Sequence, residues 1–218
     1  MIDFRNVDCM VAMKEYPDKY FDLAIVDPIY GGVTKGGYMY GKGGENLAKR
    51  KDYHFSVWEQ EKTPLEYFVE LFRVSKNQII WGGNYFTTSI KQDSQGWVVW
   101  DKRHPEGVHF ADCELAWTSF DRATRMFRFK WNGCFQEDMR NKEDRIHPTQ
   151  KPVALYEWLL RNYANEGDKI LDTHTGSGSS LIACYNLGFD ATGFEIDPTY
   201  YAKAKARLED EMAQIRMF

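Results

Sequence analysis

The chain has 218 residues, of which 43% are hydrophobic and 28% are charged, and its formal net charge is −4. This length and composition fit one folded domain, or one domain with an insertion, and exclude a disordered, collagen-like or small disulfide-stapled chain. No stretch approaches the roughly 18 apolar residues of a membrane span. The slightly acidic balance argues against nucleic-acid binding by bulk charge but allows a local basic face.

The cysteines and the first ten residues both indicate a cytoplasmic protein. Cys9, Cys113, Cys134 and Cys184 are scattered without a CxxC pair, which favours reduced thiols over zinc ligands or disulfides. Residues 1–10 carry acids and lack the apolar core of a signal peptide. We therefore expect neither a metal ion nor a membrane partner.

In the first hundred residues, apolar runs alternate with a helical pattern, which is typical of an α/β sheet. Residues 23–27 predict a buried strand that ends at an Asp-Pro pair, and residues 31–45, with seven glycines, predict a loop. Residues 78–81 and 97–100 predict two further buried strands.

One helix is expected between these strands, running to about residue 74. Thr63 can cap it, Pro64 fits its first turn, and Glu66 completes a capping box. The apolar spacing predicts that this helix buries Leu65, Phe68, Val69 and Phe72.

Residues 101–146 have short strand-like pieces, many aromatic residues and mixed charge, and we interpret them as a target-recognition region inserted into a single domain that spans residues 1–218. The rest of the chain returns to regular alternation. It predicts a helix from residue 153, a strand at 169–172, a helix at 179–187 ended by Gly188, a strand at 191–195, and a last helix capped by Asp197 that reaches about residue 212.

The strand–loop–helix–strand unit at 169–195 predicts a site for a nucleoside-containing cofactor. Gly176 and Gly178 of its loop, DTHTGSGSS, allow a ligand to approach the backbone, and the helix that follows offers free N–H groups. Glu195, at the end of the next strand, can accept both hydroxyls of a ribose. The unit is neither the GxGxxG of dinucleotide binders, because residue 181 is Leu, nor a P-loop. A tight turn with a solvated Glu195 is the alternative interpretation.

The second chemical signal is Asp27-Pro28-Ile29-Tyr30 at the end of a predicted strand. An amino group on a base becomes more nucleophilic when acceptors on both N–H bonds favour a pyramidal nitrogen. Asp27 and the Pro28 carbonyl can be those acceptors, and Tyr30 can stack on a base that has left the duplex. Alone, the string is also a common strand-end turn, but both loops would lie at the carboxyl edge of one parallel sheet.

Together these residues resemble the amino-group DNA methyltransferases that use S-adenosylmethionine. The order DPIY, a variable region, HPTQKP at 147–152, DTHTGSGSS and GFEID resembles the β-class permutation of that family, and HPTQKP is the most specific string. The resemblance covers nearly the whole chain. It implies a Rossmann-like fold, a doubly wound and mostly parallel sheet with an inserted recognition lobe.

The resemblance also implies roles for individual residues. Asp27 and Tyr30 match the catalytic acceptor and the stacking aromatic, with Pro28 in the same turn. The cofactor-binding set comprises Asp8, Thr149, Gln150, Lys151, Asp172, His174, Gly176, Ser177, Gly178, Ser179 and Glu195. In that set Thr149, Gln150 and Lys151 match the segment near the methionine part of the cofactor, Glu195 matches the ribose-binding acid, and Asp8 matches an acid near the adenine.

The chain departs from the family pattern at two positions. Ile29 replaces the second proline of the usual DPPY, and His174 replaces the usual aromatic of the cofactor loop. We expect activity to survive the first change, and we expect His174 to fill the aromatic's place, although a histidine could also titrate. Family usage of Asp, rather than Ser, at position 27 favours adenine N6 over cytosine N4.

Basic residues near the variable region are candidates for contacts with double-stranded DNA. In a strand, the stretch 122–131 would place its bases on one face and Phe127, Phe129 and Trp131 on the other. A solvated surface is the alternative for every candidate. The candidates are Lys35, Lys42, Lys49, Arg50, Lys102, Arg103, Arg122, Arg125, Arg128 and Lys130.

These observations predict a DNA methyltransferase that transfers a methyl group from S-adenosylmethionine to N6 of a flipped adenine. The alternatives are transfer to cytosine N4 or to RNA, a protein that binds cofactor and DNA without turnover, and a nucleotide-dependent oxidoreductase. The missing third glycine disfavours the oxidoreductase. The resemblance permits a homodimer and, with the small size, a methyltransferase without a nuclease domain.

Overall fold

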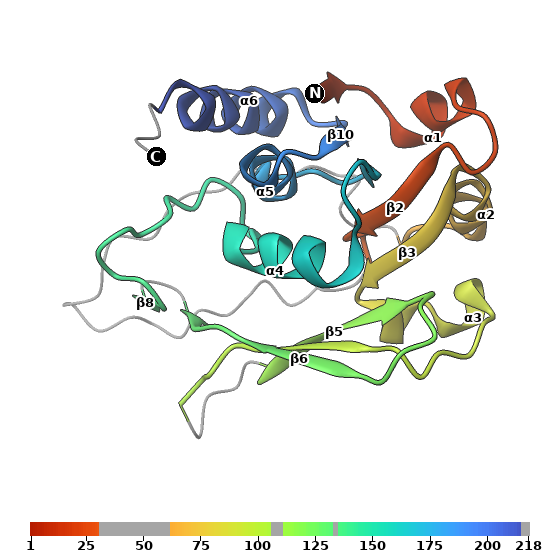
Figure 1. Cartoon of the computed structure of the whole chain (residues 1–218), viewed down its shortest axis with the longest axis horizontal. Helices are drawn as coiled ribbons and strands as arrows, with labels where there is room; N and C mark the ends of the chain where they lie inside the picture. Colours follow the sequence, from red (N-terminus) through yellow and green to blue (C-terminus); the bar gives the residue numbers. More distant parts are fainter. Residues whose placement is uncertain (31–61, 106–110, 133–134, 215–218) are drawn as a thin grey trace.

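The computed structural model describes residues 1–30, 62–105, 111–132 and 135–214 (Figure 1). Within these residues the centre is an eight-stranded sheet. Its strands follow the order β1 (Ile2–Asn6), β10 (Asp190–Glu195), β9 (Lys169–Asp172), β2 (Phe21–Val26), β3 (Ser75–Trp81), β5 (Cys113–Thr118), β4 (Val98–Asp101) and β6 (Arg125–Arg128).

The first five strands of this order pair in parallel. β5 is antiparallel to both β3 and β4, and β6 runs parallel to β4 at the edge. A separate two-stranded sheet joins β7 (Trp131–Asn132) to β8 (Phe135–Gln136). The described fold is therefore the doubly wound, mostly parallel α/β architecture that was predicted.

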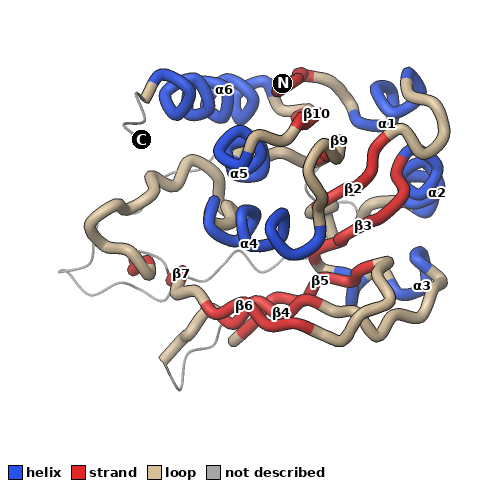
Figure 2. The backbone as a smooth tube through the Cα atoms, in the orientation of Figure 1, coloured by secondary structure: helices blue, strands red, loops and turns tan. Residues whose placement is uncertain are grey.

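Helices cover both faces of the sheet, as Figures 1 and 2 show. The face that carries α4 (Val153–Tyr163), α5 (Ser179–Leu187) and α6 (Pro198–Ala213) is opposite the face that carries α1 (Cys9–Ala12) and α2 (Leu65–Val74). Short elements complete this frame: the 3₁₀ turns Met13–Glu15 and Gly83–Tyr85, and α3 (Thr87–Ile90). No described helix has the length and apolar character needed to cross a membrane.

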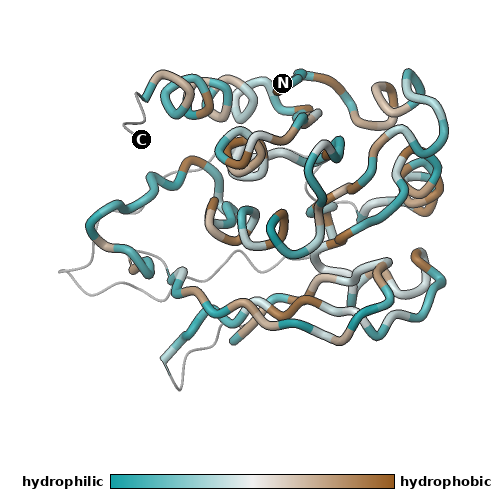
Figure 3. Tube along the Cα trace, in the orientation of Figure 1, coloured by the Kyte–Doolittle hydropathy of each residue, from teal (hydrophilic) through white to brown (hydrophobic). Residues whose placement is uncertain are grey.

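The alternation of side chains along the central strands divides the core into two clusters. On β2, Leu23 and Ile25 join the cluster under α4 and α5, whereas Ala24 and Val26 join the cluster under α2. Because both faces of β2 are covered, residues 23–26 of this strand are all apolar. Figure 3 shows the same contrast along the chain, with hydrophobic residues concentrated in the strands and helices and a largely hydrophilic segment leading to α4.

The sheet has a topological switch point between β9 and β2. From β9 the chain crosses through α5 to β10 on one side, and from β2 it crosses through α2 to β3 on the other. The two crossover helices leave from neighbouring strands and cover opposite faces, so the loops at the carboxyl ends of β9 and β2 flank a crevice suited to ligand binding.

The helix α2 corrects part of the sequence interpretation. It begins at Leu65 and has Pro64 as its N-cap, with no side-chain capping bond, so Thr63 and Glu66 form no capping box. The predicted buried stripe was wrong at Leu65 and Val69, which are 41% and 60% exposed, and correct at Phe68. The side chains that it buries are Tyr67, Phe68, Leu71 and Val74. The helix carries apolar residues on more than one side. The side that faces the sheet includes Tyr67, whose hydroxyl lies 2.6 Å from the Thr173 hydroxyl.

The C-terminal half of the chain follows the sequence expectations closely. The predicted helices and strands from residue 153 onward are present, and Gly188 ends α5 in the left-handed conformation with φ of 76°. The region 101–146 adds β5 and β6 to the main sheet, with β5 inserted between β3 and β4. Its role in target recognition stays a prediction, and the N-terminal strand β1 was not predicted.

We expect Asp197→Ala to destabilise the protein, because Asp197 is the buried N-cap of the 16-residue helix α6. Its carboxylate accepts hydrogen bonds from Thr199 N at 2.8 Å and Tyr200 N at 3.1 Å. Loss of these bonds should lower the free energy of unfolding by about 1–2 kcal/mol in a urea titration. Asp197→Asn keeps an acceptor and should lose less. Equal stability of the alanine variant and the wild type would contradict this prediction.

Candidate functional site

Four parallel strands bring an acid to the same edge of the sheet. Glu195 and Asp172 end β10 and β9, Asp27 follows β2, and Asp8 follows β1. Parallel strands place their carboxyl ends together, so residues up to 187 positions apart in sequence share one edge. This edge is where the two predicted ligand-binding loops meet.

The glycine-rich loop is held against the end of β10 by Glu195. The Gly176 N–H donates to Glu195 Oε2 at 2.8 Å, and the Asp197 N–H donates to Oε1 at 2.8 Å. Gly176 and Gly178 have φ of 55° and 79°, which L side chains rarely adopt. Burial raises the pKa of Glu195 to about 7 against the opposing effect of these amides. Each carboxylate oxygen keeps a second lone pair for a ligand hydroxyl.

Asp172 organises the start of the same loop. Its Oδ1 accepts the His174 N–H at 3.0 Å, and its Oδ2 accepts a short hydrogen bond from the Ser180 hydroxyl. Burial raises the pKa of Asp172 to about 6. The Asp172 carboxylate therefore links the end of β9 to the first turn of α5, which directly follows the glycine-rich loop.

His174 packs as an aromatic ring in this loop. It lies edge-on to Tyr67, with ring centroids 5.1 Å apart at 74°, and its Nδ1 is 2.9 Å from the Thr173 hydroxyl. Burial lowers the pKa of His174 to about 4, so the ring is neutral at physiological pH. His174 therefore contributes a neutral aromatic ring to the loop, and its role toward the cofactor stays a prediction.

Asp8 completes this end of the edge as the N-cap of α1. Its Oδ1 accepts the Met10 N–H at 2.8 Å, and the neighbouring Val7 N–H donates to the Glu195 carbonyl at 3.1 Å. The structure thus brings Asp8 next to the glycine-rich unit, although the sequence match there is short.

Asp27 lies at the centre of the edge and forms an ion pair with Lys151, a residue that the sequence analysis assigned to cofactor binding. Lys151 Nζ lies 2.5 Å from Asp27 Oδ2. Asp27 Oδ1 is buried and has no hydrogen-bond partner among the described residues. Burial raises the pKa of Asp27 and Lys151 opposes this effect. One oxygen of this carboxylate is therefore paired, and the other is an acceptor suited to an incoming N–H group.

The Lys151 ammonium is shared with a second acid, Glu114 on β5. Lys151 Nζ lies 3.1 Å from Glu114 Oε2, and Lys102 Nζ forms a short ion pair with Glu114 Oε1. Burial would raise the pKa of Glu114, but the two lysines outweigh it and lower the pKa to about 2. Burial likewise opposes the charge on Lys151, but Asp27 and Glu114 raise its pKa well above the ordinary value.

The Tyr30 ring stacks on Tyr85, with ring centroids 4.9 Å apart at 13°. Tyr85 belongs to the turn that follows β3 and is 53% exposed. Gly82 begins this turn with φ of 65°, and a Cβ added there would lie 2.5 Å from Tyr30 Cε1. The turn after β3 and the turn after β2 therefore fit together only with glycine at position 82.

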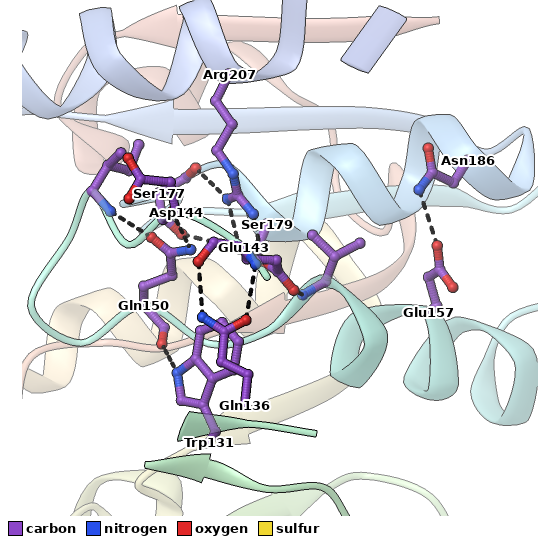
Figure 4. Close-up of polar contacts among 12 residues, drawn as sticks. Trp131, Gln136, Glu143, Asp144, Gln150, Glu157, Ser177, Ser179, Asn186 and Arg207 are labelled. Carbon is purple, nitrogen blue, oxygen red and sulfur yellow. Dashed lines mark hydrogen bonds and ion pairs between the residues drawn. The ribbon is translucent and has the colours of Figure 1, made fainter. Parts of the chain in front are cut away.

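The HPTQKP segment supports the site in ways that the sequence did not indicate. Gln150 is buried, and its amide binds the stretch before it: Nε2 donates to the Asp144 carbonyl at 3.2 Å, and Oε1 accepts the Ile146 N–H at 2.9 Å (Figure 4). The Gln150 carbonyl accepts the Trp131 indole N–H at 2.8 Å. Thr149 is exposed, with its hydroxyl 3.1 Å from His147 Nδ1. Roles of these residues toward the cofactor stay predictions.

Arg207 on α6 connects this stretch to the glycine-rich loop, as Figure 4 shows. It donates to the Ser177 carbonyl and the Ser179 hydroxyl, each at 2.9 Å, and forms an ion pair with Glu143 at 2.5 Å. The two serine hydroxyls lie 3.1 Å apart. The sequence analysis did not identify Arg207 or Glu143, because neither residue belongs to a recognisable motif.

The candidate DNA-binding residues are dispersed in the structure. Arg125 and Arg128 are exposed on the edge strand β6, and Arg128 Nε lies 3.6 Å from Asp101. The stretch 122–131 does not form one strand: it contains β6 at Arg125–Arg128 and the first residue of β7. Within β6, Arg125 shares its face with Phe127, so the predicted separation of bases from aromatics was wrong.

Other candidates form ion pairs, hydrogen bonds or ring contacts with groups of the protein itself. Lys102 is 18% exposed and pairs with Glu114, and Arg122 packs over Phe120 and donates to the Asn162 carbonyl at 2.6 Å. Arg103 lies 2.8 Å from Glu137, and the Lys130 ammonium lies over the Phe135 ring. Lys35, Lys42, Lys49 and Arg50 lie outside the described residues. DNA contact by any of these residues stays a prediction.

Comparisons with known proteins agree with this geometry. A family model described as DNA methylase, for N6 and N4 methyltransferases, matches residues 33–206. The type II methyltransferase M.HpaI of Haemophilus parainfluenzae is 29% identical over 237 aligned residues, which cover 92% of this chain and 72% of that protein.

Two solved structures show the same fold. The M1.HpyAVI–SAM complex has a TM-score of 0.60 and 21% identity, covering 95% of this chain and all of that one. The cytosine-N4-specific PvuII DNA methyltransferase has a TM-score of 0.60 and 10% identity, covering 96% and 90%. The match to the family model covers most of the chain and includes the glycine-rich loop and Glu195 at the end of β10. The chain therefore belongs to the DNA methylase family of N6 and N4 amino-methyltransferases, which use S-adenosylmethionine.

Proposed function

We propose that this protein methylates N6 of adenine in double-stranded DNA, with the target base flipped out of the helix. The observation that carries the proposal is Asp27 Oδ1, a buried acceptor without a partner among the described residues at the switch point of the sheet. An N–H of an exocyclic amino group is the donor that would satisfy it. Use of Asp rather than Ser at this position supports adenine over cytosine.

The residues at this edge fit S-adenosylmethionine as well. Glu195 offers carboxylate lone pairs to ribose hydroxyls, and Gly176 and Gly178 leave the backbone of the loop open to a ligand. At Gly178 a Cβ would come within 3.3 Å of the Ala204 carbonyl, so the loop needs glycine for packing also. The bound sulfonium would supply an activated methyl group.

The protein's own contribution is to orient and polarise the target amino group. Asp27 Oδ1 accepts one N–H and the Pro28 carbonyl accepts the other, which favours a pyramidal nitrogen. Tyr30 stacks on the base, and the proton that the nitrogen loses after transfer passes to solvent. Catalysis in this scheme is positioning plus preorganised polar groups. The base leaves the duplex stack because this acceptor is buried.

Cytosine N4 is the second candidate target. Its exocyclic amino group presents the same two N–H donors, and the family model covers both N6 and N4 enzymes. Product analysis distinguishes the two, because the methylated nucleosides differ.

The first test is transfer of labelled methyl from S-adenosylmethionine to unmethylated DNA, followed by digestion to nucleosides. We expect the label in N6-methyladenine. Asp27→Ala should lower the rate by about 100- to 1,000-fold, the usual effect of removing one preorganised polar group. Asp27→Asn loses the charge but keeps an oxygen acceptor, so it should lower the rate less. Asp18→Ala is the matched control, because Asp18 forms an exposed ion pair with Arg73. Label in N4-methylcytosine would replace the adenine assignment, and undiminished transfer by Asp27→Ala would refute the role of Asp27.

Gly82→Ala should disturb the stacking aromatic without touching the cofactor loop. The added Cβ would lie 2.5 Å from the Tyr30 ring, and φ of 65° is unfavourable for alanine. We expect the KM for DNA to rise or kcat to fall by about tenfold, equivalent to roughly 1.4 kcal/mol, with unchanged affinity for S-adenosylmethionine. Gly167→Ala is the control, because it also has positive φ but no neighbour within 4 Å. Equal activity of both variants would contradict the placement of Tyr30.

Cofactor affinity should depend on pH through Glu195. The pKa of Glu195 is raised to about 7, and the ionised carboxylate is the better acceptor for ribose hydroxyls. Affinity should therefore be full above this pKa and fall by up to about tenfold per pH unit below it. Calorimetric titrations with S-adenosylmethionine at pH 6, 7 and 8 test this expectation. Glu195→Gln should bind more weakly at pH 8 and lose this component of the pH dependence, whereas an unchanged pH profile would exclude Glu195 as its source.

A further inference from the structure

Four charged side chains form a connected cluster beside the proposed acceptor: Asp27, Lys151, Glu114 and Lys102. Three ion pairs link them in that order. All four are largely removed from water, with side-chain exposures of 15%, 3%, 25% and 18% in the same order. The cluster holds two acids and two lysines, so its formal charges cancel.

Stability does not account for this arrangement. Taking four charges out of water is costly, and well-packed apolar side chains of similar size usually stabilise a core as well or better. The cluster also lies at the carboxyl edge of the sheet rather than in the middle of a core. Of these four charged groups, the mechanism outlined above uses only Asp27, so it gives no part in methyl transfer to Lys151, Glu114 or Lys102.

The contacts of Lys151 indicate what the cluster does. Its ammonium contacts Asp27 only through Oδ2, at 2.5 Å, and also lies 3.1 Å from Glu114 and 5.4 Å from the centre of the Trp81 ring. A lysine ammonium is a compact charge on a flexible stem. Without a second acid it could move to both oxygens of Asp27 and block the acceptor. Glu114 prevents this by holding one of its donors, and Lys102 in turn holds Glu114.

We propose that Glu114 is a positioning residue for methyl transfer, which acts by holding Lys151 so that Asp27 Oδ1 stays available to the target amino group. This inference rests on the proposed function of Asp27. Glu114 is on β5, within the region 101–146. That region thus contributes to the chemical step in addition to its predicted part in recognition.

The charges that face Asp27 determine how variants shift its titration. Lys151 and Lys102 lower the pKa of Asp27, and Glu114 raises it. Asp172, Tyr156 and Tyr67 also lie in this buried environment. Removing the charge of Glu114 therefore lowers the pKa of Asp27, whereas removing that of Lys151 raises it. A loss of packing that left these charges in place would shift the titration of Asp27 in neither direction.

The experiment compares Glu114→Gln, Glu114→Asp and Lys151→Met with the wild-type protein, using labelled methyl transfer to DNA over a range of pH. Glu15→Gln is the matched control, because it makes the same chemical change in a surface ion pair with Arg5. For Glu114→Gln we expect kcat to fall about tenfold at neutral pH. Its acid limb should move to lower pH, and its Kd for S-adenosylmethionine should be unchanged. Lys151→Met should move the limb to higher pH, and Glu114→Asp should recover part of kcat because it keeps the charge.

Two results would overturn the inference: a kcat of Glu114→Gln within twofold of the wild type, or a fall in kcat with an unmoved acid limb and a lowered melting temperature. Failure of the proposed function is distinct, because the wild-type protein itself would then transfer no methyl group to DNA. If Lys151→Met does not fold, the two Glu114 variants decide the question by themselves.

Discussion

The parallel pairing of β2 with β9 is the contact on which the rest of the site depends. Leu23 pairs with Ile170 and Ala24 with Leu171, and this register places the end of β2 beside the end of β9. Both strands are buried on both faces, so the pairing is stabilised by the two apolar clusters at once. Because their crossovers leave in opposite directions, the edge between them stays open to a ligand, with Asp27 on one side and the glycine-rich loop on the other.

Burial at this edge determines the electrostatics of the acids. The pKa values of Asp172 and Glu195 are raised by burial, whereas that of Glu114 is lowered because two lysines outweigh the same effect. The edge therefore contains carboxylates with different protonation behaviour within a short distance. In the proposed scheme Asp27 accepts a hydrogen bond at neutral pH because Lys151 offsets part of the cost of burying its charge.

The segment that precedes α4 connects the variable region to the glycine-rich loop. Glu143 accepts the Val153 N–H at the start of α4 and pairs with Arg207, which holds the backbone at Ser177. Gln136 exchanges hydrogen bonds with Glu143 in the same network. The polar contacts of Figure 4 thus fix the loop, the helix and the variable region relative to one another through partly buried hydrogen bonds.

The sequence by itself determined the local features that depend on neighbouring residues. These include the buried central strands, the Asp197 cap, the Gly188 end of α5, and the loops around Asp27 and Gly176, whose order was sufficient to indicate the family. Local propensity and motif spacing carry this information because the physical causes lie within a few residues.

Only the tertiary structure decided which distant side chains meet. Glu114 and Lys102 carry no motif, and their link to Asp27 through Lys151 exists because β5 is inserted next to β3 in the sheet. The same holds for the stacking of Tyr30 on Tyr85. It also holds for the buried face of α2, because apolar residues lie on more than one side of that helix. Contacts of this kind depend on the order and register of the strands, which long-range packing selects and which the spacing of residues along the chain does not encode.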